Sequence, residues 1–307
     1  MLTAVKQIKT KPTILGVLFV LLATVGLSLK AILIKLIYLT APGIDAISIL
    51  ALRFVFALPF FLLLLYATQK HNKKTKFVRQ DLFTFIILGM AGFYVSAILD
   101  FSALAYIPAG LERLILFLYP TFVVLLSFYF RPEEISRQVI MALIICYLGV
   151  MVVFFDQVPN MTPDMMYGSG LVLAAAVVFA IYTVASVKPI QRHGSIRFTA
   201  YAMIGSTLIT FLHVFYAHGL SFFVQSLTVY GLILVMAIFS TFLPLIFMAE
   251  GVNRLGASRV SIISTSGPII TITLAVILLD EIFGFYQAIG GIMIVSGVIF
   301  VARGKRR

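Results

Sequence analysis

The sequence predicts an all-α membrane protein with ten transmembrane helices, arranged as two inverted five-helix repeats with both termini in the cytoplasm. Three observations lead to this prediction: long apolar segments, a one-sided distribution of lysine and arginine, and an internal repeat. The chain is 62% hydrophobic and only 11% charged, and its mean hydropathy is +1.11. A soluble domain cannot bury that much apolar surface, so soluble fold classes are excluded.

The apolar residues gather in segments of about 20 residues, the length that an α-helix needs to cross roughly 30 Å of hydrocarbon. In chain order, the ten segments are 14–39, 44–67, 82–106, 109–130, 135–155, 167–187, 197–217, 226–249, 255–279 and 284–302. They are too long and too continuous for the strands of a membrane β-barrel. The first segment is also too long for a cleaved signal peptide, and no small-residue cleavage site follows it.

Lysine and arginine collect on one side of the predicted membrane. With the N-terminus inside, the inner side holds 19 of the 23 basic residues and the outer loops hold none. The other four lie within the segments or at their outer ends: Lys30, Lys35, Arg53 and Arg113. Because cytoplasmic loops accumulate basic residues, this distribution predicts ten helices with both termini inside. The net charge of +12 is then explained by inner loops that face an anionic leaflet, so no nucleic-acid partner is expected.

An internal repeat divides the chain into two halves. A proline, a glutamate and a glycine recur with spacings of 13 and 16 residues, at Pro120, Glu133 and Gly149 and again at Pro268, Glu281 and Gly297. Ala109 and Ala257 keep the same offset of 148 residues. Each half has an odd number of helices, so the halves enter the bilayer in opposite senses, as in transporters that alternate between two states around a midplane site. We therefore predict a first repeat at residues 1–155 and a second at 156–307, which begins with the polar stretch 156–166.

Three stretches of this sequence resemble a known family. The strings AYIPAGLERLILFLYPTFVVLLSFYFRPEE and NRLGASRVSIISTSGPIITITLAVILLDEIFGFYQAIGGIMIVSGVIF resemble the paired signatures of EamA-type transporters of the drug/metabolite transporter superfamily. ALRFVFALPF resembles that family's second-helix arginine motif. The resemblance implies a secondary transporter, more often an exporter, with a central cavity lined by helices 1, 3, 4, 6, 8 and 9. The chain departs from many relatives in having no tryptophan in helix 1 and in carrying Glu112 and Arg113, so substrate contacts of relatives are not carried over there.

Six charged residues fall within the first-half helices, namely Lys30, Lys35, Arg53, Asp100, Glu112 and Arg113. A charge at the bilayer centre costs roughly 2.5–3.5 kcal/mol on insertion scales, so such residues usually face a cavity or a partner. Lys30 and Arg53 fall near the midplane, and Lys30 shares a helix face with small residues that leave space beside it. Lys35 is expected to extend to the lipid headgroups. The surplus of positive charge suits a substrate that carries a carboxylate.

The remaining charged residues have structural as well as functional interpretations. Asp100 and Arg113 are expected to pair, because they end and begin adjacent helices. Arg53 is expected either in a structural ion pair or against substrate, and Glu112 at a helix N-terminus can favour the helix macrodipole. Acidic residues in membrane helices commonly relay protons, so Asp100 and Glu112 are also the proton-coupling candidates.

Hydroxyl groups provide a second candidate surface, in the second half. Ser261, Ser264 and Thr265 lie before Pro268 in the ninth segment, where they either face the substrate or pack the helix and bond its own carbonyls. Tyr119 and Tyr182 either stack on a substrate or serve packing. The glutamates Glu133 and Glu281 are expected to cap loops.

The sequence shows no catalytic, cofactor or metal-binding motif, and its single cysteine, Cys146, excludes an internal disulfide. We therefore predict a proton-coupled secondary transporter, not an enzyme, in the inner (cytoplasmic) membrane. Its cargo is a small metabolite such as an amino acid or a related carboxylate-bearing compound, and export is its predicted direction. Its partners are this substrate and membrane lipid, whereas the small-residue face of Gly290, Gly291 and Gly297 serves either a homodimer or internal packing. The alternatives are an uncoupled facilitator or channel and, more distantly, a non-transporting scaffold.

Overall fold

The computed structural model describes residues 14–71, 79–130, 140–141, 144–145, 147–149, 151–152, 162–255, 260, 263–264 and 266–303. All regular secondary structure in these residues is helical, and none of them forms a strand. The predicted all-α class is therefore confirmed. Predictions that concern Glu133, Cys146, Ser261, Thr265 or the two ends of the chain lie outside the described residues.

The helices of the first half follow the predicted segments closely. They are α1 (Ile14–Thr40), α2 (Ala46–His71), α3 (Arg79–Gly89), the π-helical η1 (Met90–Val95), α4 (Ser96–Ala103), α5 (Ala109–Leu116) and α6 (Tyr119–Phe130). The segment 109–130, predicted as one helix, is interrupted between Leu116 and Tyr119. Pro120 explains the break, since it cannot donate a backbone hydrogen bond and its ring would clash with the Leu116 carbonyl in a continuous helix.

The second half is also built from apolar helices. They are α8 (Pro163–His193), α9 (Ser195–His218), the short η3 (Ser221–Phe223), α10 (Leu227–Ala237), the π-helical η4 (Ile238–Phe242), α11 (Leu243–Leu255), α13 (Gly267–Leu279) and α14 (Phe285–Arg303). Within the predicted segment 255–279, α13 begins only at Gly267. Pro268 lies in its first turn, where the missing N–H group is tolerated.

Six helices of the described chain are long and apolar enough to cross a membrane. They are Ile14–Thr40, Ala46–Tyr66, Gln80–Ala103, Pro163–His193, Ile196–His218 and Leu227–Met248, and Gly267–Leu279 and Phe285–Gly297 are shorter apolar helices. These helices are those of a multi-pass membrane protein. The count of ten, with both termini in the cytoplasm, stays a prediction.

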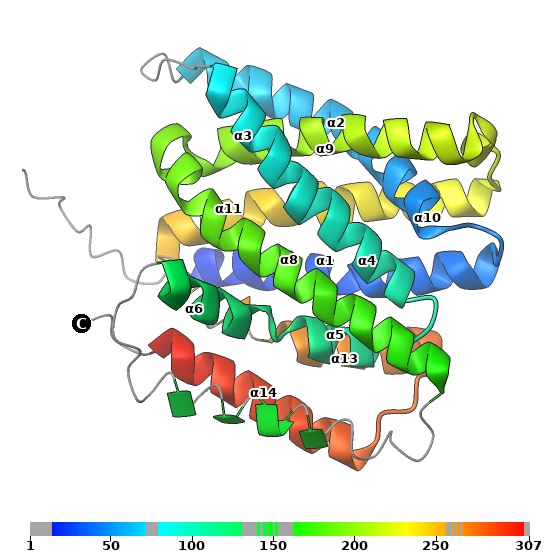
Figure 1. The fold of residues 1–307 in the computed structure, drawn as a ribbon, viewed down its shortest axis with the longest axis vertical. Helices are drawn as coiled ribbons and strands as arrows, with labels where there is room; N and C mark the ends of the chain where they lie inside the picture. The colour runs from blue at the N-terminus through cyan, green and yellow to red at the C-terminus, as the bar shows by residue number, and fades with distance from the viewer. Residues whose placement is uncertain are drawn as a thin grey trace, which may run out of the picture.

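Helices from the two halves interleave. Helix α1 packs against α10, α11 and α13 of the second half, and α8 packs against α4, α5 and α6 of the first. Helices α2 and α9 lie side by side along one edge of the molecule, and α14 lies at the opposite edge (Figure 1). The interior contacts therefore form mainly between halves.

Two π-helical turns mark the places where the halves cross. Segments η1 and η4 begin at Met90 and Ile238, 148 residues apart. On α1, a side chain at Gly26 would overlap the Phe239 carbonyl of η4. Gly92 of η1, in turn, lies under the ring of Tyr182 from α8. A helix of each half thus packs closely on the π-helical turn of the other half, and π-helical turns frequently occur at functional sites.

Candidate functional site

A buried ion pair joins the first and third predicted transmembrane helices. The Lys30 ammonium on α1 lies 2.5 Å from Oδ2 of Asp100 on α4, and the Asp100 side chain is only 2% exposed. The predicted pairing of Asp100 with Arg113 is therefore wrong. Arg113 acts on Asp100 only through its electrostatic field. Helices α4 and α5 are adjacent along the chain, but the Asp100 carboxylate contacts α1 instead.

Glu112 lies beside this ion pair, in the first turn of α5, and is fully buried. Within the described residues, neither of its oxygens has a hydrogen-bond donor, and Oδ1 of Asp100 also lacks one. The charged groups that act on Glu112 are Asp100, Lys30 and Arg113. Two ionised carboxylates can only accept hydrogen bonds, so Asp100 and Glu112 can bond to each other only when one is protonated. The arrangement can therefore hold a proton.

Arg113 reaches from α5 to the beginning of α13 in the second half. Its Nη2 atom lies 3.2 Å from the place that a Cβ atom on Gly267 would occupy. The carbonyl of Gly267 accepts a hydrogen bond from Ser28 Oγ at 3.1 Å, so α1 also contacts this point. The Nε atom of Arg113 is buried and has no acceptor in the described part of the chain. An unused arginine N–H group and a helix N-terminus both attract anions, and here they lie together.

Arg53 of α2 supplies a further cation, and its partner is a hydroxyl group. Its Nε atom donates to Oγ1 of Thr241 in η4 at 2.8 Å. Its guanidinium lies 5.4 Å from the ring centre of Phe101, and the Lys30 ammonium lies 5.9 Å from the same ring. Phe101 therefore contacts two cations through its ring. Sequence reasoning missed Phe101 and Thr241, because no signal separates them from the chain's other phenylalanines and threonines.

The remaining predicted residues lie elsewhere. Tyr182 packs among the aromatic rings around Gly92 and Phe198, which is a packing role in this structure. Tyr119 makes an edge-to-face contact with Phe179 at 5.3 Å. Ser264 lies 3.8 Å from the Met248 sulfur. Ser261 and Thr265 are outside the described residues, so the hydroxyl face of the ninth segment stays a prediction.

The small residues of helix 10 face the chain's own interior. A side chain at Gly149 would meet the Gly290 carbonyl at 2.8 Å, and one at Gly291 would meet Leu114 at 3.3 Å. Gly290 and Gly291 thus contact other helices of the same chain, and a homodimer stays a prediction. Among the described side chains, no group of three or more His, Cys, Asp or Glu residues could hold a metal ion.

The sequence profile of the EamA-like transporter family matches residues 14–155 and 166–303, which together span most of the chain. The chain belongs to the EamA-like transporter family. The uncharacterized transporter YcbK of Bacillus subtilis is 31% identical over 307 residues, which cover 98% of this chain and 96% of that protein. An uncharacterized transporter of Archaeoglobus fulgidus is 27% identical over 260 residues, which cover 85% of this chain and 90% of that one.

One protein of known crystal structure has the same fold. It superposes with a TM-score of 0.63 over 93% of this chain and 96% of its own, at 16% sequence identity. At that identity the likeness shows the fold alone. The predicted family is confirmed, and with it a multi-pass membrane transporter; family and relatives give no indication of an enzyme. The names of these relatives give no substrate, so the cargo has to be inferred from the site.

Proposed function

We propose that this EamA-family protein is a proton-coupled secondary transporter of a small carboxylate-bearing metabolite such as an amino acid. Its direction is export across the cytoplasmic membrane. The observation that carries the proposal is the buried cluster of Lys30, Asp100, Glu112 and Arg113, in which α5 of the first half meets α13 of the second. In a membrane interior, such charges commonly mark a substrate or proton path.

The substrate carboxylate binds at Arg113. The guanidinium has an unused N–H group and lies against the N-terminal end of α13. Charge-assisted hydrogen bonds from arginine are among the strongest in proteins, and the helix N-terminus adds positive potential. Lys30 and Arg53 add positive charge close to Phe101. This combination supports an anionic group as the recognised part of the cargo.

The proton binds between Asp100 and Glu112. When neither carboxyl is protonated, Glu112 and the second oxygen of Asp100 offer negative charge to the ammonium group of an amino acid, since Lys30 pairs with only one Asp100 oxygen. When a proton occupies the pair, that attraction is weakened. The proton and the substrate ammonium therefore compete for the same two carboxyls. A carrier that releases the substrate on one side and returns with a proton exchanges the two. Exchange of this kind uses an inward proton gradient to drive export.

The alternation between inner and outer access rests on the two halves as inverted repeats, at residues 1–155 and 156–307. Three observations support this part of the proposal. The π-helical turns begin 148 residues apart, α1 and α8 make reciprocal contacts with the opposite half, and the family profile matches two separate ranges. A carrier with such halves can exchange their roles around a fixed central site.

Counterflow in proteoliposomes tests the proposal. The substrates are a pool of labelled amino acids, and the competitors are their methyl esters, amides and N-acetyl derivatives, with and without a pH gradient. We expect saturable exchange that the esters and amides inhibit at least tenfold less well, because they lack the carboxylate. Equal inhibition by the esters and amides would mean that the transporter does not recognise a substrate carboxylate.

Two amide variants test the proton site. In Asp100→Asn and Glu112→Gln, acceleration by the pH gradient should disappear. Glu250→Gln is the matched control, because Glu250 pairs with Arg254 of the same helix. If both amide variants keep the full pH response, the protein is not coupled through these carboxyls. Flux that neither saturates nor shows counterflow would favour an uncoupled facilitator.

A further inference from the structure

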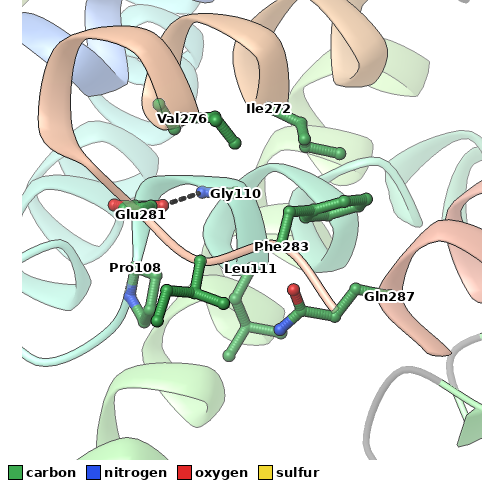
Figure 2. Close-up of a pocket in the computed structure, with 10 residues that line it drawn as sticks. Pro108, Gly110, Leu111, Ile272, Val276, Glu281, Phe283 and Gln287 are labelled. Carbon is green, nitrogen blue, oxygen red and sulfur yellow. Dashed lines mark hydrogen bonds between the residues drawn. The ribbon is translucent and has the colours of Figure 1, made fainter. Parts of the chain in front are cut away.

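A carboxylate of the second half caps a helix of the first half. Glu281 lies in the connection between α13 and α14, and its oxygens accept hydrogen bonds from the backbone N–H groups of Ala109 and Gly110 at 2.7 and 3.0 Å. These are the first two residues of α5. Figure 2 shows the Glu281 carboxylate directed at Gly110 from the adjoining loop. Helix N-termini carry N–H groups without an intrahelical partner, and a carboxylate satisfies them well.

Helix α5 has no cap of its own. Its N-cap residue is Pro108, whose side chain makes no capping hydrogen bond. The helix is only eight residues long and ends before the break at Pro120. Its N-terminal end is therefore held by a residue 172 positions away in the sequence.

The capped helix carries two members of the buried charge cluster. Glu112 and Arg113 follow Ala109 by three and four residues, so they lie about one turn from the capped end. A short helix moves as a unit, because its backbone hydrogen bonds are local. A displacement of the capped end is therefore transmitted directly to both side chains.

We propose that Glu281 is a positioning residue of the transport cycle. In the state seen here, it holds α5 so that Arg113 lies against Gly267 and Glu112 lies beside Asp100. Release of Glu281 lets α5 move these two residues away from α13. This inference rests on the proposed function. It states that the contact between Glu281 and α5, which joins the two halves, sets the geometry of the site.

Glu281 lines a small pocket between the two halves. The lining of this pocket also includes Pro108, Leu111, Ile272, Phe283 and Gln287 (Figure 2). Gly110 leaves space there, since a Cβ atom on it would lie 3.6 Å from the Glu281 oxygen. Lys35 of α1 is close enough to act on Glu281 electrostatically. The cap thus borders a small pocket between the halves and has a cation nearby.

The chain offers a matched control at the adjacent position. Asp280 carries the same charge in the same connection, and none of the described residues makes a hydrogen bond or ion pair with its side chain, while its backbone N–H group donates to the Ala275 carbonyl. Its backbone is left-handed, with φ of 52°. Asparagine tolerates that conformation, so Asp280→Asn removes one negative charge without adding strain. An effect that appears when Glu281 is substituted but not in Asp280→Asn is therefore caused by loss of the helix cap.

The first readout is a distance that needs no substrate. Spin labels are attached at Ala105→Cys and Ile277→Cys, both exposed positions of opposite halves, in a chain whose Cys146 is replaced by serine. In Glu281→Ala we expect a second population in which the two labels are farther apart. Glu281→Gln keeps one acceptor oxygen, so this second population should be smaller there. The ratio of the two populations should change roughly 5- to 30-fold, the range that loss of a helix cap produces. Asp280→Asn should match the parent chain.

The second readout separates positioning from simple stabilisation. Counterflow should show a KM raised by a similar factor in Glu281→Ala, with recovery in Glu281→Gln. A lower melting temperature with an unchanged distance distribution would mean that the cap is only structural, and the proposal would be wrong. An equal shift in Asp280→Asn would also overturn it. If Glu281→Ala shifts the distance but the parent protein shows no counterflow, Glu281 still positions α5, and it is the proposed substrate that is wrong.

Discussion

The two halves of the molecule share a helical layout but differ in chemistry. In the first half, five charged side chains reach the interior, namely Lys30, Arg53, Asp100, Glu112 and Arg113. At the offset of 148 residues, Asp100, Glu112 and Arg113 correspond to Met248, Val260 and Ser261, which carry no charge. The second half instead contributes a hydroxyl group to Arg53, the N-terminal end of α13 to Arg113, and the cap on α5.

This difference gives each half a separate task. Under the proposed function, a similar backbone in both halves allows the two ends of the carrier to open in turn, whereas charge is needed only where cargo and proton bind. Substitutions of first-half charges should therefore alter affinity, coupling and the stability of the buried cluster. Substitutions at second-half contacts should alter geometry and packing. The following predictions test this division, beginning with the largest expected effect.

Removal of Lys30 should have the largest effect. Lys30→Met leaves the Asp100 carboxylate buried without its cation, and breaking a buried pair in this way costs about 3–5 kcal/mol. We expect a large loss of melting temperature in detergent and no measurable counterflow. Lys188→Met is the control, since Lys188 is an exposed lysine of α8.

A double variant shows whether the ion pair is needed for function or only tolerated by the fold. Lys30→Met with Asp100→Leu removes both charges, so most of the lost stability should return. Transport should stay absent, because the cluster has lost two of its charges. A double variant that transports at the parent rate would show that the pair serves architecture alone.

Arg113 should come second. Arg113→Lys keeps the charge but loses the planar fork, so one ammonium replaces several N–H groups against Gly267. We expect KM for a carboxylate substrate to rise about 10- to 100-fold, or roughly 1.4–2.7 kcal/mol, with a smaller change in maximal rate. Arg254→Lys, a change within an i,i+4 pair on α11, is the control. An unchanged KM would mean that the substrate carboxylate does not bind at Arg113.

Much of this architecture can be predicted from the sequence, because its causes are local. Apolar segments and the family signatures need no knowledge of contacts, and charges inside such segments mark the interior directly. The partners of those charges could not be predicted. Proximity along the chain pairs Asp100 with Arg113, yet its partner is Lys30 on a helix that is distant in sequence. The cap between Glu281 and α5 is likewise a contact between halves.

Irregular helix geometry explains much of the remainder. A π-helical turn adds one residue to the turn and rotates everything beyond it by about 100° relative to a regular helix. Segments η1 and η4 contain no proline to mark them in the sequence, and both fall in the middle of apolar runs. The face on which Asp100 or Thr241 lies could therefore not be read from a regular helical period.

Third, a packing change on the contact between halves should lower stability. In Gly26→Ala, the new methyl group would overlap the Phe239 carbonyl of η4, which cannot move without shifting the π-helical turn. We expect a loss of about 1–3 kcal/mol, measured as a lower melting temperature in detergent. Gly231→Ala is the matched control, since a methyl group there meets no heavy atom within 4 Å. Equal effects of the two substitutions would show that α1 and η4 are not closely packed.

The smallest effect should come from the exposed contact between α2 and α9. Asp45 precedes α2, accepts a hydrogen bond from Ser48 N at 2.9 Å and lies 2.5 Å from His218 on α9. Partial burial raises the pKa of Asp45, but the hydrogen bonds from Ser48 and the bond and charge of His218 outweigh it and lower that pKa below its ordinary value. A lowered pKa in the folded protein means that the stabilisation is complete above about pH 4 and is lost as the pH falls further.

Asp45→Asn should therefore destabilise the protein at pH 7 by less than about 1 kcal/mol, because both partners are more than a third exposed and water screens the pair. The difference in melting temperature between this variant and the parent should shrink as the pH falls below about 4, where the parent carboxylate itself becomes protonated. A double-mutant cycle with His218→Gln isolates the pair from the hydrogen bond to Ser48. A coupling energy well above 1 kcal/mol at pH 7 would mean that this exposed pair contributes more to stability than an exposed pair should. The division between a charged, buried first half and a supporting second half would then need revision, because the two halves would also be held together at the surface.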